Sequence, residues 1–176
     1  RDIWCWILSA VIFIASLTLI GKETVYSLRG FCGLGLSFAA DGFGVILAVL
    51  TGAIWLITTI FSKEYMAAER NRNRYYFFVF LTLGATMGIF LSADLFTTFI
   101  FFEIMSFTSF VLVMHDEEDF TVRSAKTYLA VAVIGGLVTL MGLFMMYQKA
   151  GTLNMAELTA FMQSRENPAE FYAIGV

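Results

Sequence analysis

Charged residues, prolines and histidines are scarce in this sequence. Only 14% of its 176 residues are charged and 59% are hydrophobic, with one proline and one histidine. Because soluble domains carry about a quarter charged residues, this composition and the mean hydropathy of +0.79 predict a polytopic membrane protein. The net charge of −3 argues against a nucleic-acid partner.

Cysteine is also rare. Cys5 lies in an apolar run and Cys32 in a loop, and neither has the spacing of a metal or redox site. The sequence therefore predicts no disulfide and no metal cluster, and it contains no cofactor motif.

The two ends of the chain are unusual. It begins with Arg1 and stops at Val176 inside an apolar stretch, and its first apolar run is too long for a signal-peptide core. We expect an internal piece of a longer polypeptide, with residues 1–176 forming a single membrane domain.

Five apolar runs are long enough to cross a membrane, since about 20 residues of helix span the hydrocarbon core. The third and fourth are separated only by a short turn, which predicts a tight helical hairpin. A weaker amphipathic helix follows, and another helix is expected to start near Pro168, capped by Asn167. The predicted spans are Ile3–Ile20, Gly42–Phe61, Tyr75–Ala93, Leu95–Met114 and Val122–Tyr147, and the amphipathic helix is Met155–Gln163.

The segment from Gly30 to Phe38 alternates small residues with apolar ones. It is too rich in glycine for a spanning helix, so we predict a short extramembrane hairpin or extended loop. The expected fold class is all-α, a transmembrane helix bundle with one short glycine-rich hairpin.

Lysine and arginine are distributed unequally between the two ends of the spans, and short cytoplasmic loops carry the excess of these residues. The cytoplasmic side therefore holds residues 63–74 and 116–123, although 116–119 are acidic, because Asp and Glu contribute little to this rule. One side has seven basic residues, Arg1, Lys63, Arg70, Arg72, Arg74, Arg123 and Lys126, and the other has four, Lys22, Arg29, Lys149 and Arg165.

Glu103 is a carboxyl in the middle of Thr97–Met114, a stretch otherwise free of charge. In a helix over Leu95–Met114 it lies about 12 Å from one end and about 16 Å from the other, near the midplane of the bilayer. A charged group at that depth costs about 2.5–3.5 kcal/mol on insertion scales. An intramembrane Glu is therefore a functional-site hypothesis.

The helical wheel gives Glu103 an aromatic shell, in which a carboxylate is costly unless a cation lies nearby. A carboxyl held in this way can exchange a proton, as a relay requires. The alternative is a Glu that ties two helices together by one hydrogen bond. Its wheel neighbours are Phe96, Phe99, Phe107 and Phe110, with Ser106 as the nearest hydroxyl.

Arg123 and Lys126 stand at the cytoplasmic start of the fifth span. Lys126 is either a cation that modulates Glu103 from about a turn inside the membrane or a side chain that reaches back to the interface without a function there. The sequence leaves both interpretations open.

Other polar residues have structural explanations. Asp41 and Asp94 each precede a span and suit the cap of a helix N-terminus. His115, beside four acids at a helix end, could carry protons at the surface, but an ordinary interfacial histidine is expected. Tyr128 is expected to pack against neighbouring side chains.

Glycines mark two of the spans. Gly84 and Gly88 in the third, and Gly135 and Gly136 in the fifth, offer smooth surfaces for close helix approach. They predict tightly packed neighbours and carry no chemistry of their own.

The order of these features forms a larger pattern. A glycine-rich hairpin leads to Asp41-Gly42, and a helix and an arginine-rich loop follow. Ser92-Ala93-Asp94-Leu95-Phe96 comes next, and then Phe101–Ser106. The last feature is a helix that contains Lys126 and Gly135-Gly136. This pattern, from about Gly30 to Tyr147, resembles the antiporter-like subunits of respiratory complex I and its relatives, the multi-subunit cation/proton antiporters and membrane-bound hydrogenases. The resemblance is most specific at Phe102-Glu103-Ile104-Met105, where the family keeps Phe or Trp before its key Glu.

The resemblance implies roles for individual residues. Glu103 would be the counterpart of the Glu in the family's proton-translocating site, and Lys126 that of the positive residue near the start of the next helix. The family pairs its Glu with a Lys on a broken helix of the same inverted-repeat half, which here would begin near Pro168 with the Lys beyond Val176. Because the family usually has Asn-Asp where this chain has Ala93-Asp94, a role for Asp94 other than capping is not expected.

The leading interpretation is therefore part of a proton-translocating subunit in a bacterial or archaeal plasma membrane. Glu103 would bind and release a proton, while other membrane subunits of the complex supply redox chemistry or cation exchange. The expected partners are those subunits, the rest of the polypeptide, lipid and protons. Two alternatives remain: a non-conducting scaffold or assembly subunit, and a carrier that binds sodium through Glu103 with hydroxyls or carbonyls.

Overall fold

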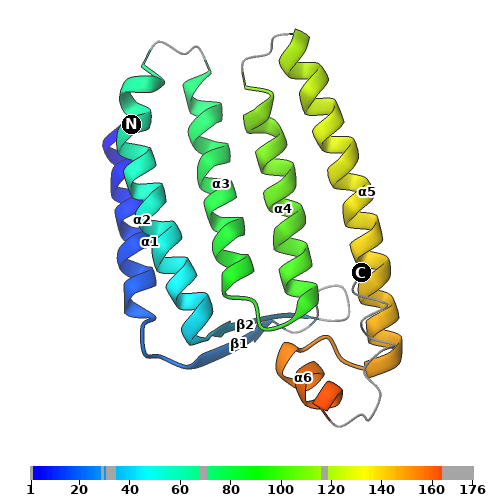
Figure 1. Ribbon diagram of the computed structural model, residues 1–176. Coiled ribbons are helices and arrows are strands. Elements are labelled where there is room, and N and C mark those ends of the chain that lie inside the picture. The colour runs from blue at the N-terminus through cyan, green and yellow to red at the C-terminus, as the bar shows by residue number, and fades with distance from the viewer. Residues whose placement is uncertain (1, 29, 31–34, 68–70, 116–118, 164–176) are drawn as a thin grey trace.

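The computed structural model describes residues 2–28, 30, 35–67, 71–115 and 119–163. Within these ranges helices form a bundle, and a two-stranded hairpin lies at one end of it (Figure 1). Each helix from α1 to α4 packs against the next one in the chain. The elements are α1 (Asp2–Thr18), β1 (Thr24–Leu28), β2 (Leu36–Ala40), α2 (Gly42–Tyr65), α3 (Arg72–Phe90), α4 (Leu95–Val113), α5 (Asp119–Ala150) and α6 (Met155–Gln163).

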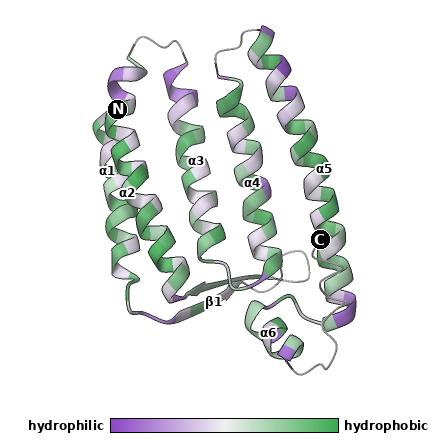
Figure 2. Ribbon diagram, viewed as in Figure 1, coloured by the Kyte–Doolittle hydropathy of each residue, from purple (hydrophilic) through white to green (hydrophobic). Residues whose placement is uncertain are grey.

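Among the described residues, α2, α4 and α5 are long and apolar enough to cross a membrane. The apolar helix over Ile3–Thr18 is shorter, and α3 begins with a polar run that contains Arg72 and Arg74. Figure 2 shows hydrophobic colours along the lengths of α1 to α5 and hydrophilic colours gathered near several of their ends. Every predicted span is a helix, and the crossing of the membrane by all five stays a prediction.

Three helices extend by three or more residues beyond the apolar runs predicted for them, and one of these is α2, which ends at Tyr65 rather than Phe61. α3 begins at Arg72 rather than Tyr75, and α5 covers Asp119–Ala150 rather than Val122–Tyr147. Hydropathy marks the apolar part of a helix, whereas backbone hydrogen bonds set its ends and continue through polar residues. The amphipathic helix α6 has the predicted bounds, and the helix expected near Pro168 lies outside the described residues.

The predicted hairpin is present, with β1 antiparallel to β2 and Thr24 opposite Ala40. The prediction placed the whole hairpin within Gly30–Phe38. In the structure β1 ends at Leu28, before this segment, and β2 begins at Leu36, near its end. Gly30 and Gly35 have φ angles of 97° and 81°, a region that glycine enters without a steric penalty because it has no Cβ. The glycines therefore turn the chain between the strands.

Asp41 and Asp94 cap helices, as the sequence predicts. The Asp41 carboxylate accepts from the Gly44 N–H at 3.1 Å at the start of α2. The Asp94 carboxylate accepts from the Thr97 N–H at 2.7 Å at the start of α4. Each bond satisfies one of the backbone donors that the first turn of a helix leaves free.

The turn between α3 and α4 joins the hairpin to the segment that leads to α6. The Ala93 N–H donates to the Ser37 carbonyl of β2 at 2.9 Å, and the Leu95 N–H donates to the Leu153 carbonyl at 3.0 Å. This turn is thus held between β2 and the chain just before α6. It fixes the end of the helix that carries Glu103.

Apolar side chains of the bundle face outward to an extent rarely seen in soluble domains. Ile134 and Val138 of α5 are 63% and 68% exposed, and only a few side chains of this helix are buried. An apolar outer face suits contact with lipid or with other membrane helices. A buried apolar cluster lies where α4 meets α5 and contains Phe96, Leu143 and Leu153.

Candidate functional site

Glu103 lies near the middle of α4 on the face that meets α5. Ser106 and Phe107, about one turn further along α4, line the same contact between the two helices. Phe96, two turns before Glu103, joins Leu143 of α5 in the apolar cluster. Of the side that the helical wheel selected, Phe96 and Glu103 thus face α5, whereas Phe107 stays 52% exposed.

Gly136 is the residue of α5 that meets the Glu103 carboxyl. It is buried, and a Cβ built on it would lie 2.8 Å from Cδ and 2.9 Å from Oε2 of Glu103, with Oε1 nearer still. These separations are shorter than van der Waals contact. The sequence predicted close packing at Gly135-Gly136, but it did not reveal that the neighbour is the carboxyl of Glu103.

One oxygen of this carboxyl lacks a hydrogen-bond partner within the described part of the chain. Oε1 of Glu103 is buried there and accepts no hydrogen bond. Most buried polar atoms are paired, and leaving one unpaired costs about 1–3 kcal/mol. A carboxyl oxygen in this state can be satisfied by a proton or by a cation.

A crevice lies between α4 and α5 beside the carboxyl. It extends from Glu103 toward the helix ends that carry His115 and Lys126, and apart from Glu103 its lining offers one hydroxyl. The space is too narrow for a water-sized sphere. Its lining consists of Glu103, Ser106 and Phe107 of α4 and Leu129, Ala132 and Val133 of α5.

Lys126 does not reach this site. Its side chain is exposed, and it precedes Gly136 by roughly 15 Å along the helix axis at about 1.5 Å per residue. Arg123, one turn nearer the start of α5, is exposed as well. Any effect of Lys126 on Glu103 in this structure therefore acts at a distance.

His115 and Tyr128 lie away from Glu103. The His115 carbonyl accepts from Arg74 at 2.9 Å, and its ring lies edge-on to Tyr75 with centroids 5.6 Å apart. These contacts tie the end of α4 to the start of α3, which is a structural role. Tyr128 is 37% exposed, more than a packing role predicts.

Asp94 does more than cap α4. Besides the Thr97 N–H, its carboxylate accepts from the Thr97 hydroxyl at 2.6 Å and from the Ser37 N–H of β2 at 3.1 Å. The sequence predicted the cap from local spacing. The bond to Ser37 joins residues far apart in the chain, so no local signal could have revealed it.

Metal-binding side chains do not gather around Glu103. The described residues contain no group of three or more His, Cys, Asp or Glu side chains that could hold a metal ion. Cys5 lies in α1, and Cys32 lies outside the described ranges.

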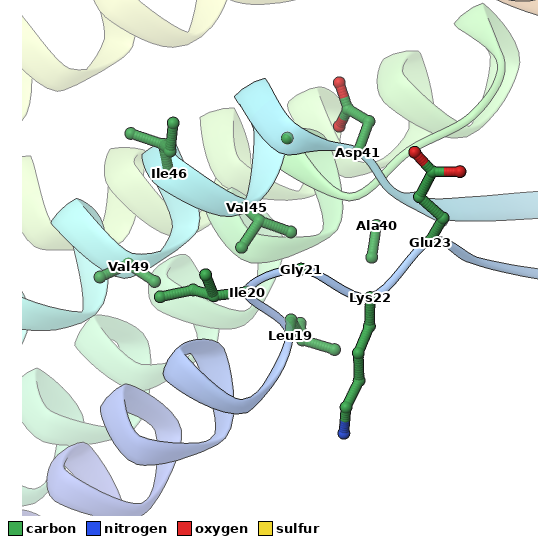
Figure 3. A pocket seen from close by; sticks show the side chains of 11 residues that line it. Leu19, Ile20, Gly21, Lys22, Glu23, Ala40, Asp41, Val45, Ile46 and Val49 are labelled. Carbon is green, nitrogen blue, oxygen red and sulfur yellow. The ribbon is translucent and has the colours of Figure 1, made fainter.

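A larger pocket of about 380 Å³ lies at the hairpin end of the bundle, between the end of α1 and the start of α2. Figure 3 shows the Lys22 ammonium pointing away from the apolar side chains of Val45 and Ile46. This pocket shares no residue with the crevice beside Glu103, so it is separate from the candidate site.

Sequence comparison relates this chain to known membrane proteins. A family model described as "NADH:quinone oxidoreductase/Mrp antiporter, TM" matches residues 92–176. A Na(+)/H(+) antiporter subunit of Alkalihalophilus pseudofirmus is 28% identical over 142 residues, which cover 81% of this chain and 29% of that protein. The chain thus spans less than a third of the length of this relative.

Two solved structures share the fold. The membrane-bound sulfane sulfur reductase, an archaeal respiratory membrane complex, contains a chain with a TM-score of 0.84 and 19% identity, covering 98% of this chain and 37% of that one. A chain of the Mrp complex from a Dietzia species has a TM-score of 0.79 and 22% identity to this chain, and the match covers 97% of this chain and 33% of that one. These findings confirm the predicted resemblance and the all-α membrane bundle.

Proposed function

Because this chain is an antiporter-like, multi-pass integral membrane protein of the bacterial or archaeal plasma membrane, we propose that it forms part of a proton-translocating subunit. Within it, Glu103 binds and releases the transported proton. Partner membrane subunits couple this movement to redox chemistry or to cation exchange. The names of its relatives, an antiporter subunit and membrane complexes, support this interpretation.

The observation that carries the proposal is the unpaired buried oxygen of Glu103. A Glu whose only task was to tie α4 to α5 would be expected to donate or accept a hydrogen bond across that contact. It meets Gly136 instead, which offers no side chain. A carboxyl whose buried oxygen has no fixed partner, near the middle of an apolar helix, is suited to exchange a proton.

A proton fits this site better than a sodium ion. Hard cations in proteins take several oxygen ligands, whereas the crevice beside Glu103 offers one hydroxyl, that of Ser106, among apolar side chains. A proton needs only the carboxyl itself and a path to reach it. This favours proton transfer at Glu103 over a sodium-binding carrier.

The test is Glu103→Gln in the full-length subunit within its assembled complex. Glutamine keeps the size of the side chain and removes the titratable group, so proton uptake by inverted membrane vesicles should fall sharply. The matched control is Glu64→Gln, which removes an exposed carboxyl from the last turn of α2 and should leave uptake unchanged. Subunit amounts are compared by immunoblotting.

Two outcomes would favour the alternatives. Wild-type proton uptake by the Glu103→Gln complex would leave Glu103 as a structural residue and support a scaffold. Binding of radioactive sodium by the purified wild-type complex that is lost with Glu103→Gln would support a sodium-binding site at Glu103.

A further inference from the structure

We propose that Gly136 is a positioning residue for Glu103. The absence of a side chain at position 136 lets the α5 backbone approach the carboxyl and sets where the carboxyl lies. This inference rests on the proposed function of Glu103 as a proton relay. It gives Gly136 a specific role that general helix packing does not.

The contacts of the two adjacent glycines differ completely. A Cβ on Gly136 would come within 3.0 Å of three atoms, and all three belong to the carboxyl of Glu103. A Cβ on Gly135 would meet nothing within 4 Å, and Gly135 is exposed. One glycine thus faces the candidate relay, and its neighbour faces away from the protein.

The atoms that a methyl group at position 136 would meet lie at the end of a flexible side chain. A new methyl would therefore displace the Glu103 carboxyl, while the backbones of α4 and α5 need not move. Because carbon atoms pack best at about 3.5–4.0 Å, the displacement would be roughly 1 Å. The substitution should change the position of the carboxyl without preventing the helices from packing.

A displacement of this size matters for proton transfer. The carboxyl must lie within hydrogen-bond reach of the group that gives or takes the proton. Misplacement of a reacting group by about 1 Å can cost about 100-fold in rate. The position of Glu103 is therefore as important to the relay as its charge.

The matched pair Gly136→Ala and Gly135→Ala tests the inference in the full-length assembled complex. Both substitutions replace glycine by the best helix former in the same helix, so their effects on helix propensity are alike. We expect proton uptake to fall by up to about 100-fold with Gly136→Ala, the cost of a displacement of about 1 Å, and to stay near wild type with Gly135→Ala. Equal activities of the two variants would overturn the inference.

A second-site change separates positioning from general damage. Aspartate at position 103 is one methylene shorter, which leaves room for a methyl group at position 136. In the Glu103→Asp background, adding Gly136→Ala should therefore cost much less than it costs in the wild type, and the two effects should be non-additive. Losses that simply multiply would contradict a direct contact between these positions.

A chemical readout is independent of pumping. Dicyclohexylcarbodiimide modifies carboxyls in apolar surroundings, and the labelled Glu103 peptide can be quantified by mass spectrometry. Displacement out of the α4–α5 contact should make Glu103 react several-fold faster in the Gly136→Ala complex than in the wild-type or Gly135→Ala complex. Equal rates would overturn the inference.

The outcomes also distinguish this inference from the proposed function. If Glu103→Gln pumps like the wild type, the relay proposal fails, while the labelling rates still show whether Gly136 positions the carboxyl. If Gly136→Ala prevents assembly in both the Glu103 and the Glu103→Asp backgrounds, Gly136 is required by the backbone packing and the positioning role is wrong.

Discussion

Replacing Asp94 by alanine should release strand β2 from the start of α4. The Asp94 carboxylate accepts from both the N–H and the hydroxyl of Thr97, and from the N–H of Ser37. Alanine removes all three bonds. The Ser37 N–H keeps one weaker alternative, the Thr97 hydroxyl oxygen at 2.9 Å.

The expected loss follows from these bonds. An N-cap replaced by alanine costs about 1 kcal/mol, and hydrogen bonds to a charged group contribute about 1.5–3 kcal/mol each. Because Ser37 retains one bond, we expect the free energy of local opening to fall by about 2–3 kcal/mol in total. At about 1.4 kcal/mol per factor of ten, this predicts roughly 30- to 150-fold faster exchange of the affected amides.

Hydrogen exchange measured by mass spectrometry on the full-length protein tests this prediction. The informative amides are those of Ala39 and Ala93, which link β2 to the α3–α4 turn. Asp41→Ala is the control, because its exposed carboxylate caps only α2 through Gly44. It should loosen the start of α2 and leave Ala93 protected. Unchanged exchange at both amides in Asp94→Ala would refute the reasoning.

Two further predictions concern sidedness and the distant cation. A cysteine introduced by Asn71→Cys should react with an impermeant thiol reagent only from the cytoplasmic face, because the basic residues around α3 lie on that side. Asn71 is exposed and makes no side-chain cap bond, so the change should not disturb the fold. Labelling from outside would invert the topology. Lys126→Ala should leave most proton uptake intact, because Lys126 is exposed and far from Gly136 along α5. A loss of proton uptake equal to that of Glu103→Gln would show that Lys126 acts in the relay.

Local chemistry made much of this structure predictable from the sequence. Long apolar runs locate the helices because only a helix satisfies its own backbone in lipid. The spacing before Gly42 and Leu95 identified Asp41 and Asp94 as caps, and the glycine content of 30–38 indicated a hairpin. A single carboxyl in an apolar helix was enough to select Glu103.

The ends of the elements were less predictable. α3 and α5 continue into polar residues at their ends, because backbone hydrogen bonds do not stop where hydropathy falls. Lys126 shows a similar limit: its place at the start of α5 could be predicted, but its distance from Glu103 depends on which turn of α5 packs against α4.

The amino-acid sequence by itself determined the membrane class, the helices and the identity of the one carboxyl within α4. Only the tertiary structure decided what that carboxyl meets. Glu103 faces Gly136, and Asp94 holds Ser37, because helices and strands distant in sequence pack together. Such contacts depend on the rotation and depth at which one element lies against another, and a pattern within a single element does not specify either.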